Sequence, residues 1–247
     1  MRTVIAWKTF AILVIACAIA SMLVVPYQVA LSPDLASYGA ILYFNAFLQG
    51  LIIFSIATFL GLILSEKVGF DLPVLEGRHK MENFKEILMP SALWGLLAGA
   101  LITLLALPFG SSSMELLAAD SIVPVWARFL ALFYGGIAEE VLMRLFAMSL
   151  FAWIFIKIKV PKKISIWIAI IISAVLFGLG HLPFTAGLTE ITADVVARAV
   201  VLNGAGAVIF SLLYWRRGLE SAIIAHFFAG IILRFISPQI ALLIIYS

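Results

Sequence analysis

The 247-residue sequence predicts an all-α fold, a polytopic bundle of seven or eight transmembrane helices. Hydrophobic residues make up 64% of the chain and charged residues only 12%, whereas soluble domains are about 45 to 50% apolar and about 25% charged. Uncharged runs such as 35–65 and 87–114 exceed the ~20 apolar residues that a helix needs to cross a bilayer. No stretch is left over for a soluble domain, so we expect a single integral membrane domain over residues 1–247.

The predicted spans follow the apolar runs in order along the chain. The first, 9–25, also has features of a signal peptide, because Arg2 and Lys8 precede an apolar stretch with small residues; we interpret it as a transmembrane helix. Six further spans are expected at 37–65, 89–107, 125–156, 164–182, 193–215 and 219–237. The apolar tail 240–246 is too short to cross alone and predicts at most a partial eighth helix.

The loops between these spans differ in charge on the two sides of the predicted membrane. One side collects 12 of the 16 basic residues: Arg2, Lys8, Lys67, Arg78, Lys80, Lys85, Lys157, Lys159, Lys162, Lys163, Arg216 and Arg217. By the positive-inside rule this side, with the amino terminus, is expected to be cytoplasmic. These residues face anionic lipid, so the net charge of +3 requires no nucleic-acid partner. Within the polar loop 65–90, residues 81–88 predict a short interfacial helix.

Three charged residues interrupt the fourth span, within the stretch YGGIAEEVLMRLF at 134–146. A charged side chain near the bilayer centre costs about 2.5 to 3.5 kcal/mol, so Glu139, Glu140 and Arg144 are expected to pair or to take part in function. Other arginines lie nearer the ends of predicted spans, where we expect them to extend to the membrane surface: Arg128, Arg198 and Arg234.

Helical geometry separates the two glutamates. Glu140 and Arg144 are four residues apart, on one helix face and within reach of an ion pair, whereas Glu139 is rotated by about 100° from Glu140. We therefore interpret Glu140 and Arg144 as a structural pair rather than as direct catalysts. Glu139 is left as an unpaired carboxylate available for chemistry. Gly135 and Gly136 lie on its face and leave room for water, a substrate or a neighbouring helix.

Two histidines interrupt later spans, His181 in FGLGHLPF and His226 in SAIIAHFFAG. A lone histidine in an apolar helix is more often a hydrogen-bonded core residue than a catalyst, but two of them with an unpaired glutamate indicate a site. Small residues on their faces, Gly178 and Gly230, are expected to leave space for a cavity. A neutral histidine can hold a water molecule or stabilise an oxyanion.

These motifs resemble those of the type II CAAX prenyl endopeptidases and the wider CAAX-protease and bacteriocin-processing family of intramembrane proteases. EEVLMR fits the pattern EExxxR, FGLGH fits FxxxH, and HFFAG fits HxxxN/D except at its last position. The three elements occur in order on successive predicted helices. The similarity covers about residues 125–235, where we expect the catalytic core.

The resemblance implies a membrane bundle of eight helices, or nearly so, in which the first glutamate of the motif activates water. Carried over residue by residue, Glu139 acts as general base, and His181 and His226 position water and stabilise the oxyanion. Glu140 with Arg144 supplies supporting structure.

The sequence departs from the family pattern at Gly230, where the family has Asn or Asp. The missing polar group is expected to weaken activity, to shift its role to Asn203 on the preceding helix, or to mark a non-proteolytic member. Asn203 lies among small residues in LNGAGAV, so helix packing explains it equally well.

We interpret the chain as an intramembrane endopeptidase that cleaves a membrane-associated peptide or protein, such as a prenylated CAAX substrate, with water activated by Glu139. No cofactor is expected. The alternative is a protease that depends on zinc or another divalent metal, with Glu139, His181 and His226 as ligands. That arrangement would use the only free carboxylate, and the sequence lacks HExxH, so metal-free chemistry is preferred.

Two other classes of function were weighed against the protease. A transporter or channel that used the same buried groups would need further polar residues along a path across the membrane. Asn45 with Gln49 is the only further obvious pair, so the sequence argues against this class. A scaffold or immunity protein would keep the fold without the chemistry, and Gly230 is the one argument for it.

Overall fold

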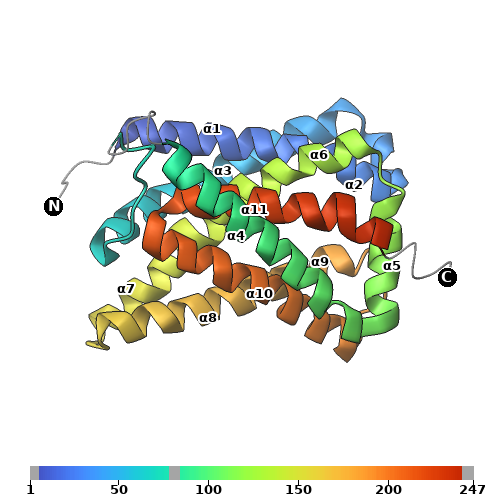
Figure 1. The fold of residues 1–247 in the computed structure, drawn as a ribbon. Coiled ribbons are helices and arrows are strands. Elements are labelled where there is room, and N and C mark those ends of the chain that lie inside the picture. Colours follow the sequence, from blue (N-terminus) through green and yellow to red (C-terminus); the bar gives the residue numbers. More distant parts are fainter. Residues whose placement is uncertain (1–5, 78–83, 241–247) are drawn as a thin grey trace.

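The structure is a computed structural model that describes residues 6–77 and 84–240, and within these ranges it is helical without any strand (Figure 1). The longer helices are α1 (Trp7–Leu23), α3 (Ala40–Val68), α4 (Phe84–Leu105), α8 (Lys162–Gly180), α10 (Ala193–Arg217) and α11 (Leu219–Ile231). Shorter ones are α2 (Val25–Leu31), α5 (Gly110–Ser121), α6 (Val125–Phe133), α7 (Ser149–Lys157) and α9 (Leu182–Thr185). The all-helical prediction is therefore confirmed for the described residues.

Six helical segments of the described chain are long and apolar enough to cross a membrane: Trp7–Leu31, Ala40–Val68, Phe84–Phe109, Lys162–Thr185, Ala193–Arg217 and Leu219–Ile240. The predicted fourth span is also continuously helical, from Val125 to Lys157, but it carries the charged residues and is not among the six. The predicted partial eighth helix lies outside the described residues except for Ile240. The number of seven or eight crossings stays a prediction.

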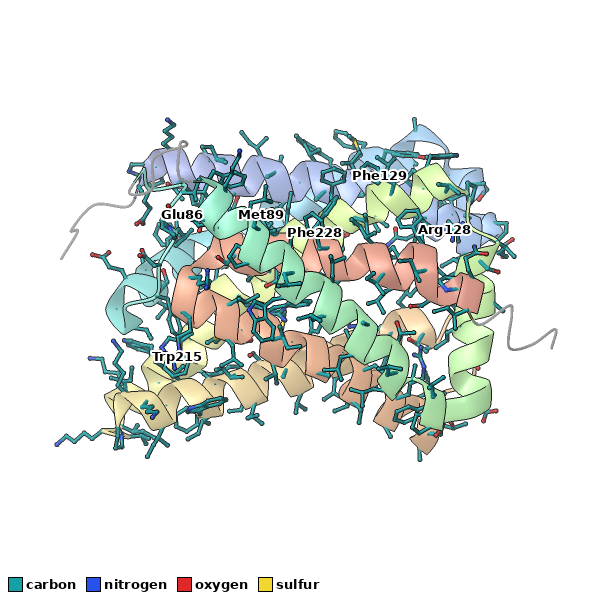
Figure 2. All side chains as sticks on the ribbon, viewed as in Figure 1. Glu86, Met89, Arg128, Phe129, Trp215 and Phe228 are labelled. Carbon is teal, nitrogen blue, oxygen red and sulfur yellow. The ribbon has the colours of Figure 1, made fainter. Side chains whose placement is uncertain are left out.

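The outer surface of the bundle carries large apolar side chains. Met89 and Phe129, labelled in Figure 2, are 67% and 46% exposed, and similar residues follow along α3 and α4. Exposure of apolar side chains on this scale is unusual in a soluble monomer and fits contact with lipid tails. The predicted separate helix at 81–88 is wrong in the described part, because Phe84–Leu88 are the first residues of the continuous helix α4.

The helices run between two ends of the bundle (Figure 1). One end collects the starts of α1 and α4, the end of α3, and the α7–α8 and α10–α11 connections, and so carries most of the basic residues. Here Glu220 accepts hydrogen bonds from the backbone N–H groups of Val74 (3.0 Å) and Leu75 (2.8 Å). The loop that follows α3 is thereby fixed to the start of α11. The opposite end is formed by α2, α5 and the start of α10.

Close helix crossings depend on small residues. A Cβ atom added at Gly95 of α4 would lie 2.2 Å from the carbonyl oxygen of Ala225 on α11, so only glycine permits this approach. A Cβ atom at Gly178 would lie 2.6 Å from the Cα atom of Val200. The prediction that Gly178 leaves space for a cavity is therefore wrong, because this residue lets α8 pack directly against α10.

Replacement of Gly95 by alanine is expected to destabilise the protein by about 1 to 3 kcal/mol, because overpacking pushes α4 away from α11. Gly204→Ala is the matched control, since its added Cβ atom would lie at an ordinary 3.7 Å from the Ala174 carbonyl oxygen. Thermal unfolding of the detergent-purified variants measures the difference. Equal midpoints for both variants would show that the α4–α11 crossing has room to relax.

Candidate active site

The helix that carries the two glutamates changes its hydrogen bonding around them. Tyr134–Glu139 (η4) and Val141–Met148 (η5) form π-helical segments between α6 and α7. Such i→i+5 turns are rare and occur frequently at functional sites, where they widen the helix locally. The hydrophobic pattern of the sequence did not predict them.

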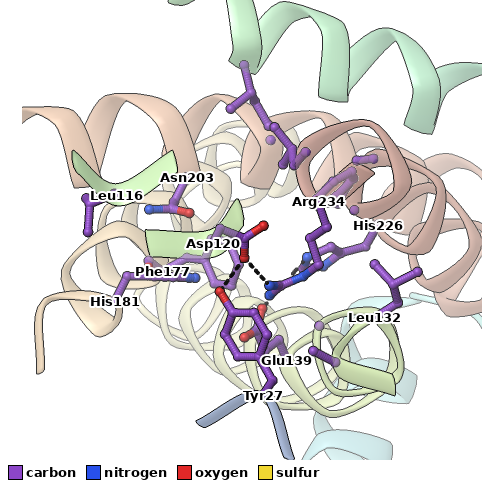
Figure 3. Close-up of a pocket in the computed structure, with 18 of the residues that line it drawn as sticks. Tyr27, Leu116, Asp120, Leu132, Glu139, Phe177, His181, Asn203, His226 and Arg234 are labelled. Atoms are coloured by element: carbon purple, nitrogen blue, oxygen red, sulfur yellow. Dashed lines mark hydrogen bonds and ion pairs between the residues drawn. The ribbon is translucent and has the colours of Figure 1, made fainter. Parts of the chain in front are cut away.

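A cavity of about 270 Å³ lies inside the bundle (Figure 3). Glu139 from η4, His181 after α8 and His226 from α11 all line it. Asn203 and Gly230 line the same cavity. The structure thus brings together the three residues predicted to be catalytic, which lie on different helices; their catalytic roles stay predictions.

His226 lies between the two glutamates. Its Nδ1 atom is 2.7 Å from Oε1 of Glu140, and its Nε2 atom is 3.8 Å from Oε2 of Glu139. A carboxylate only accepts, so Nδ1–H donates to Glu140 and the neutral ring presents an unprotonated Nε2. Stacking on Phe210, with ring centres 4.6 Å apart, fixes the ring plane. A Cβ atom at Gly135 would lie 3.2 Å from Nε2, so this glycine keeps the nitrogen uncovered.

Glu140 has a second partner in Arg144. The two side chains are 0% and 1% exposed, and Oε1 of Glu140 lies 3.0 Å from Nη1 of Arg144. The guanidinium group also lies over the rings of Phe177 (4.8 Å) and Phe210 (5.4 Å). The ion pair expected from the four-residue spacing is present, and the aromatic faces further offset the burial of the cation. The sequence did not predict that Glu140 also orients His226.

His181 follows the last residue of α8 and is held by its own helix. Its Nδ1 atom is 2.7 Å from the carbonyl oxygen of Phe177, so Nδ1–H donates and Nε2 is the unprotonated nitrogen of the neutral ring. The ring also packs edge-on against Phe177 at 4.7 Å. The short helix α9 follows, and its Phe184 stacks on Tyr27 of α2 at 6.3 Å. The uncharged stretch after His181 therefore packs back against the bundle.

Asn203 and Gly230 lie on neighbouring helices at the cavity wall. The Nδ2 atom of Asn203 donates to the carbonyl oxygen of Ala199 at 2.9 Å, a bond within α10. A Cβ atom at Gly230 would lie 2.7 Å from Cδ2 of Leu132, the far end of a flexible side chain. Asn203 thus combines a helix-internal bond with a place in the cavity wall, and Gly230 contributes no polar group.

A polar cluster that the sequence did not predict forms one side of the cavity. The hydroxyl of Tyr27 donates to Oδ1 of Asp120 at 2.5 Å, and Nη1 of Arg234 lies 3.3 Å from the same oxygen. Arg128, 6% exposed, donates from Nη1 to the carbonyl oxygen of Arg234 at 2.9 Å. The expectation that these arginines extend to the membrane surface is wrong for Arg128 and Arg234, because buried partners hold them. The sequence held one sign of this cluster: both arginines lie at the same end of the predicted transmembrane spans.

Arg198 has a place in the same cavity wall. It lies on α10, half-buried, and was also expected to extend to the surface. The guanidinium groups of Arg198 and Arg234, from different helices, therefore both line the cavity.

The predicted metal alternative can be compared with the positions of its three ligands. Among the described residues, no group of three or more His, Cys, Asp or Glu side chains is placed to hold a metal ion. The alternative with Glu139, His181 and His226 as ligands therefore has no support from the geometry. The unprotonated Nε2 atoms of His181 and His226 each have a lone pair that can accept a hydrogen bond from water.

The fold and the cavity define a class of protein: a helical membrane protein with a carboxylate and two histidines inside its bundle. Residues 121–232 match the family model described as type II CAAX prenyl endopeptidase Rce1-like. This match confirms the resemblance recognised from the three motifs and supports assignment of the chain to the CAAX protease family.

The family is a protease family, so the match supports peptidase chemistry at the level of class. Together with the six apolar spans, it indicates an integral membrane protein. No curated protein and no solved structure matches the chain.

Proposed function

We propose that the protein is an intramembrane endopeptidase that cleaves membrane-associated peptides or proteins, with prenylated CAAX sequences as the first class to test. The observation that carries the proposal is the shared cavity of Glu139, His181 and His226. Glu139 is 22% exposed into this space, whereas Glu140 is fully buried against Arg144. The two adjacent glutamates therefore have different surroundings and different roles.

In the proposed reaction Glu139 takes a proton from water as the water oxygen attacks the carbonyl carbon of the scissile peptide. The resulting tetrahedral intermediate carries the oxyanion. Glu139 then returns the proton to the amide nitrogen, the C–N bond breaks, and a carboxyl group and an amine are released. The proton that Glu139 accepts in the first step is thus the one that it donates in the second.

The tautomers of the two histidines define what each ring can contribute. With Nδ1–H donated to Glu140 and to Phe177, the neutral rings of His226 and His181 accept hydrogen bonds at Nε2 and so hold the attacking water. Donation to the oxyanion requires a doubly protonated ring. For His226 the carboxylate of Glu140 supplies the counter-charge for that form.

Asn203 is the proposed source of the neutral oxyanion donor. Its amide has two hydrogens, and the bond to Ala199 uses one of them. In this assignment Asn203 on α10 replaces the polar residue that the family motif places at position 230.

The Asn203 assignment predicts a rescue. Asn203→Ala is expected to lower kcat about 100-fold, as loss of one oxyanion donor does, and to leave unfolding unchanged because only a bond within α10 is lost. Adding Gly230→Asn in that background is expected to restore much of the rate, since the end of Leu132 can rotate away. Wild-type kcat in Asn203→Ala would assign this residue to helix packing alone.

The experiment that tests the proposed function is a cleavage assay with purified protein in lipid nanodiscs. A farnesylated CAAX peptide and its unmodified counterpart are compared by mass spectrometry, with and without chelator. Cleavage that persists with chelator supports the metal-free reaction, and its loss would return the metal alternative. If neither peptide is cut by an intact, folded preparation, the scaffold interpretation encouraged by Gly230 becomes the better one.

We also propose that the basic end of the bundle is cytoplasmic. Single cysteines at Lys162 and Arg217, at two connections of that end, are expected to react with a membrane-impermeant maleimide only after the cell membrane is opened. The native Cys17 is 0% exposed, so it should give little background. A cysteine at Glu190, on the opposite side, should react in intact cells. The reverse pattern would refute this orientation.

A further inference from the structure

Three exposed lysines from different helices gather at the basic end of the bundle, where α3, α7 and α8 meet. The Nζ atoms of Lys67 and Lys157 lie 5.6 and 5.7 Å from the centre of the same ring, that of Trp153 on α7. A Cβ atom added at Gly69 would lie 3.1 Å from Nζ of Lys162, so the first residue of α8 extends over the end of α3. We call these three lysines and Trp153 the lysine patch.

The positive charge of the lysine patch is not balanced within the described part of the chain. No carboxylate of those residues lies within ion-pair distance of Lys67, Lys157 or Lys162. Lys67 and Lys157 stand in the last turns of α3 and α7, where the helix dipole favours a cation. Lys162 stands in the first turn of α8, where the dipole disfavours a cation and no acidic residue offsets it. Helix dipoles therefore explain two of the lysines but not the gathering of all three.

Apolar side chains continue the lysine patch along the outer surface. Ile158, next to Lys157, is 64% exposed, and Ile164, in the first turn of α8, is 52% exposed. Further along α8, Trp167 packs edge to face against Trp215 of α10, which Figure 2 labels, with ring centres 6.0 Å apart. Tryptophan is enriched where a membrane meets water. A group of cations beside an apolar, tryptophan-bearing surface fits an amphiphile better than a soluble anion.

We infer that the lysine patch binds the headgroup of an anionic phospholipid from the leaflet at the basic end. Each ammonium group has three N–H donors for the phosphate oxygens, and the acyl chains lie along the exposed apolar side chains of α7 and α8. Basic groups between helices at one membrane surface recognise such headgroups. The site differs from a diffuse attraction of the basic loops because it depends on three particular lysines. It lies outside the cavity, so the inference does not rest on the proposed protease activity.

A lipid bound at this position would join the ends of three helices. One of them, α7, continues the helix that carries Glu139 and Glu140. A ligand that binds the folded state and not the unfolded state raises the stability in proportion to the logarithm of its concentration. Anionic phospholipid is therefore expected to raise the unfolding temperature of the purified protein.

The test measures lipid binding to the delipidated, detergent-purified protein by native mass spectrometry. Phosphatidylglycerol and phosphatidylcholine with the same acyl chains are compared. Phosphatidylglycerol is expected to bind about 10- to 100-fold more tightly, since each lysine near an anionic headgroup contributes a factor of about five. The triple variant Lys67→Gln, Lys157→Gln and Lys162→Gln should lose this preference. Phosphatidylglycerol should also raise the unfolding temperature of the wild type but not that of the triple variant.

The matched control is a second triple variant, Lys8→Gln, Lys85→Gln and Arg217→Gln. These three residues are exposed at the same end of the bundle and lie outside the lysine patch, and their replacement removes the same net charge. The control is expected to keep the preference for phosphatidylglycerol. If the first triple variant does not fold, the single replacements Lys67→Gln, Lys157→Gln and Lys162→Gln should each weaken binding of phosphatidylglycerol about fivefold.

Three outcomes would overturn the inference. The first is equal affinity of the wild type for the two lipids. The second is an equal loss of preference in the two triple variants, which would assign the effect to the overall charge of the basic end. Glycerol 3-phosphate, a soluble headgroup without acyl chains, tests the other source of phosphate. Stabilisation by this compound equal to that by the lipid would show that the lysine patch binds a soluble phosphate instead.

Discussion

Glu139→Gln is expected to abolish peptide cleavage without lowering the unfolding temperature. Glutamine keeps the size and hydrogen bonding of the side chain but cannot accept the proton from water. Loss of a general base costs about 10² to 10⁴ in rate. The nearest ionisable contact of Glu139 is Nε2 of His226 at 3.8 Å, and the Glu139 side chain is 22% exposed, so little of the stability is expected to depend on its charge. Turnover of the farnesylated peptide and thermal unfolding are measured on the same preparation.

Glu190→Gln is the matched control for this variant, because Glu190 is exposed and lies outside the cavity lining. It is expected to retain both rate and stability. Glu139→Asp tests position as well as charge: a shorter carboxylate should restore a small part of the rate. Full cleavage by Glu139→Gln would show that another group activates the water.

Glu140→Gln is expected to have the opposite signature, a loss of stability of about 3 to 5 kcal/mol. The reason is that Arg144, 1% exposed, would keep its charge without a counter-charge, and breaking a buried pair costs this much. The glutamine oxygen can still accept from Nδ1 of His226, so part of the ring orientation survives. Yield and unfolding temperature in detergent report the change.

The double variant Glu140→Gln with Arg144→Met separates the stranded charge from the rest of the effect. An apolar side chain of similar length next to Phe177 and Phe210 should recover most of the stability. It should not recover the rate, because His226 lacks its carboxylate partner. A Glu140→Gln protein as stable as the wild type would mean that the aromatic rings alone sustain Arg144.

The features predictable from sequence were those with local or compositional causes. The pairing of Glu140 with Arg144 follows from a four-residue spacing, which a π-helical turn did not disrupt. The cost of burying ionisable groups singled out Glu139 and the two histidines, and the order of the three motifs agreed with that choice. All three line one cavity.

The features that sequence could not predict arise where separate helices meet. The bond between Glu140 and His226 joins residues 86 positions apart and depends on the exact crossing of α11 with η4. The contact between Tyr27 and Asp120 spans 93 positions. Treating each arginine as an independent charge near a membrane surface missed Arg128 and Arg234, whose partners come from other segments. Gly178 was assigned to a cavity because the pattern of small residues does not tell space from close packing.

The position of the cavity has a consequence for the fate of the products. Tyr27 of α2 and Asp120 of α5 border it, so it lies toward the end of the bundle away from the basic connections. A soluble cleavage product is therefore expected to diffuse away on that side, while a product with a lipid anchor stays in the membrane. If the basic connections face the cytoplasm, fragments made by cells or sealed vesicles should accumulate in the opposite compartment.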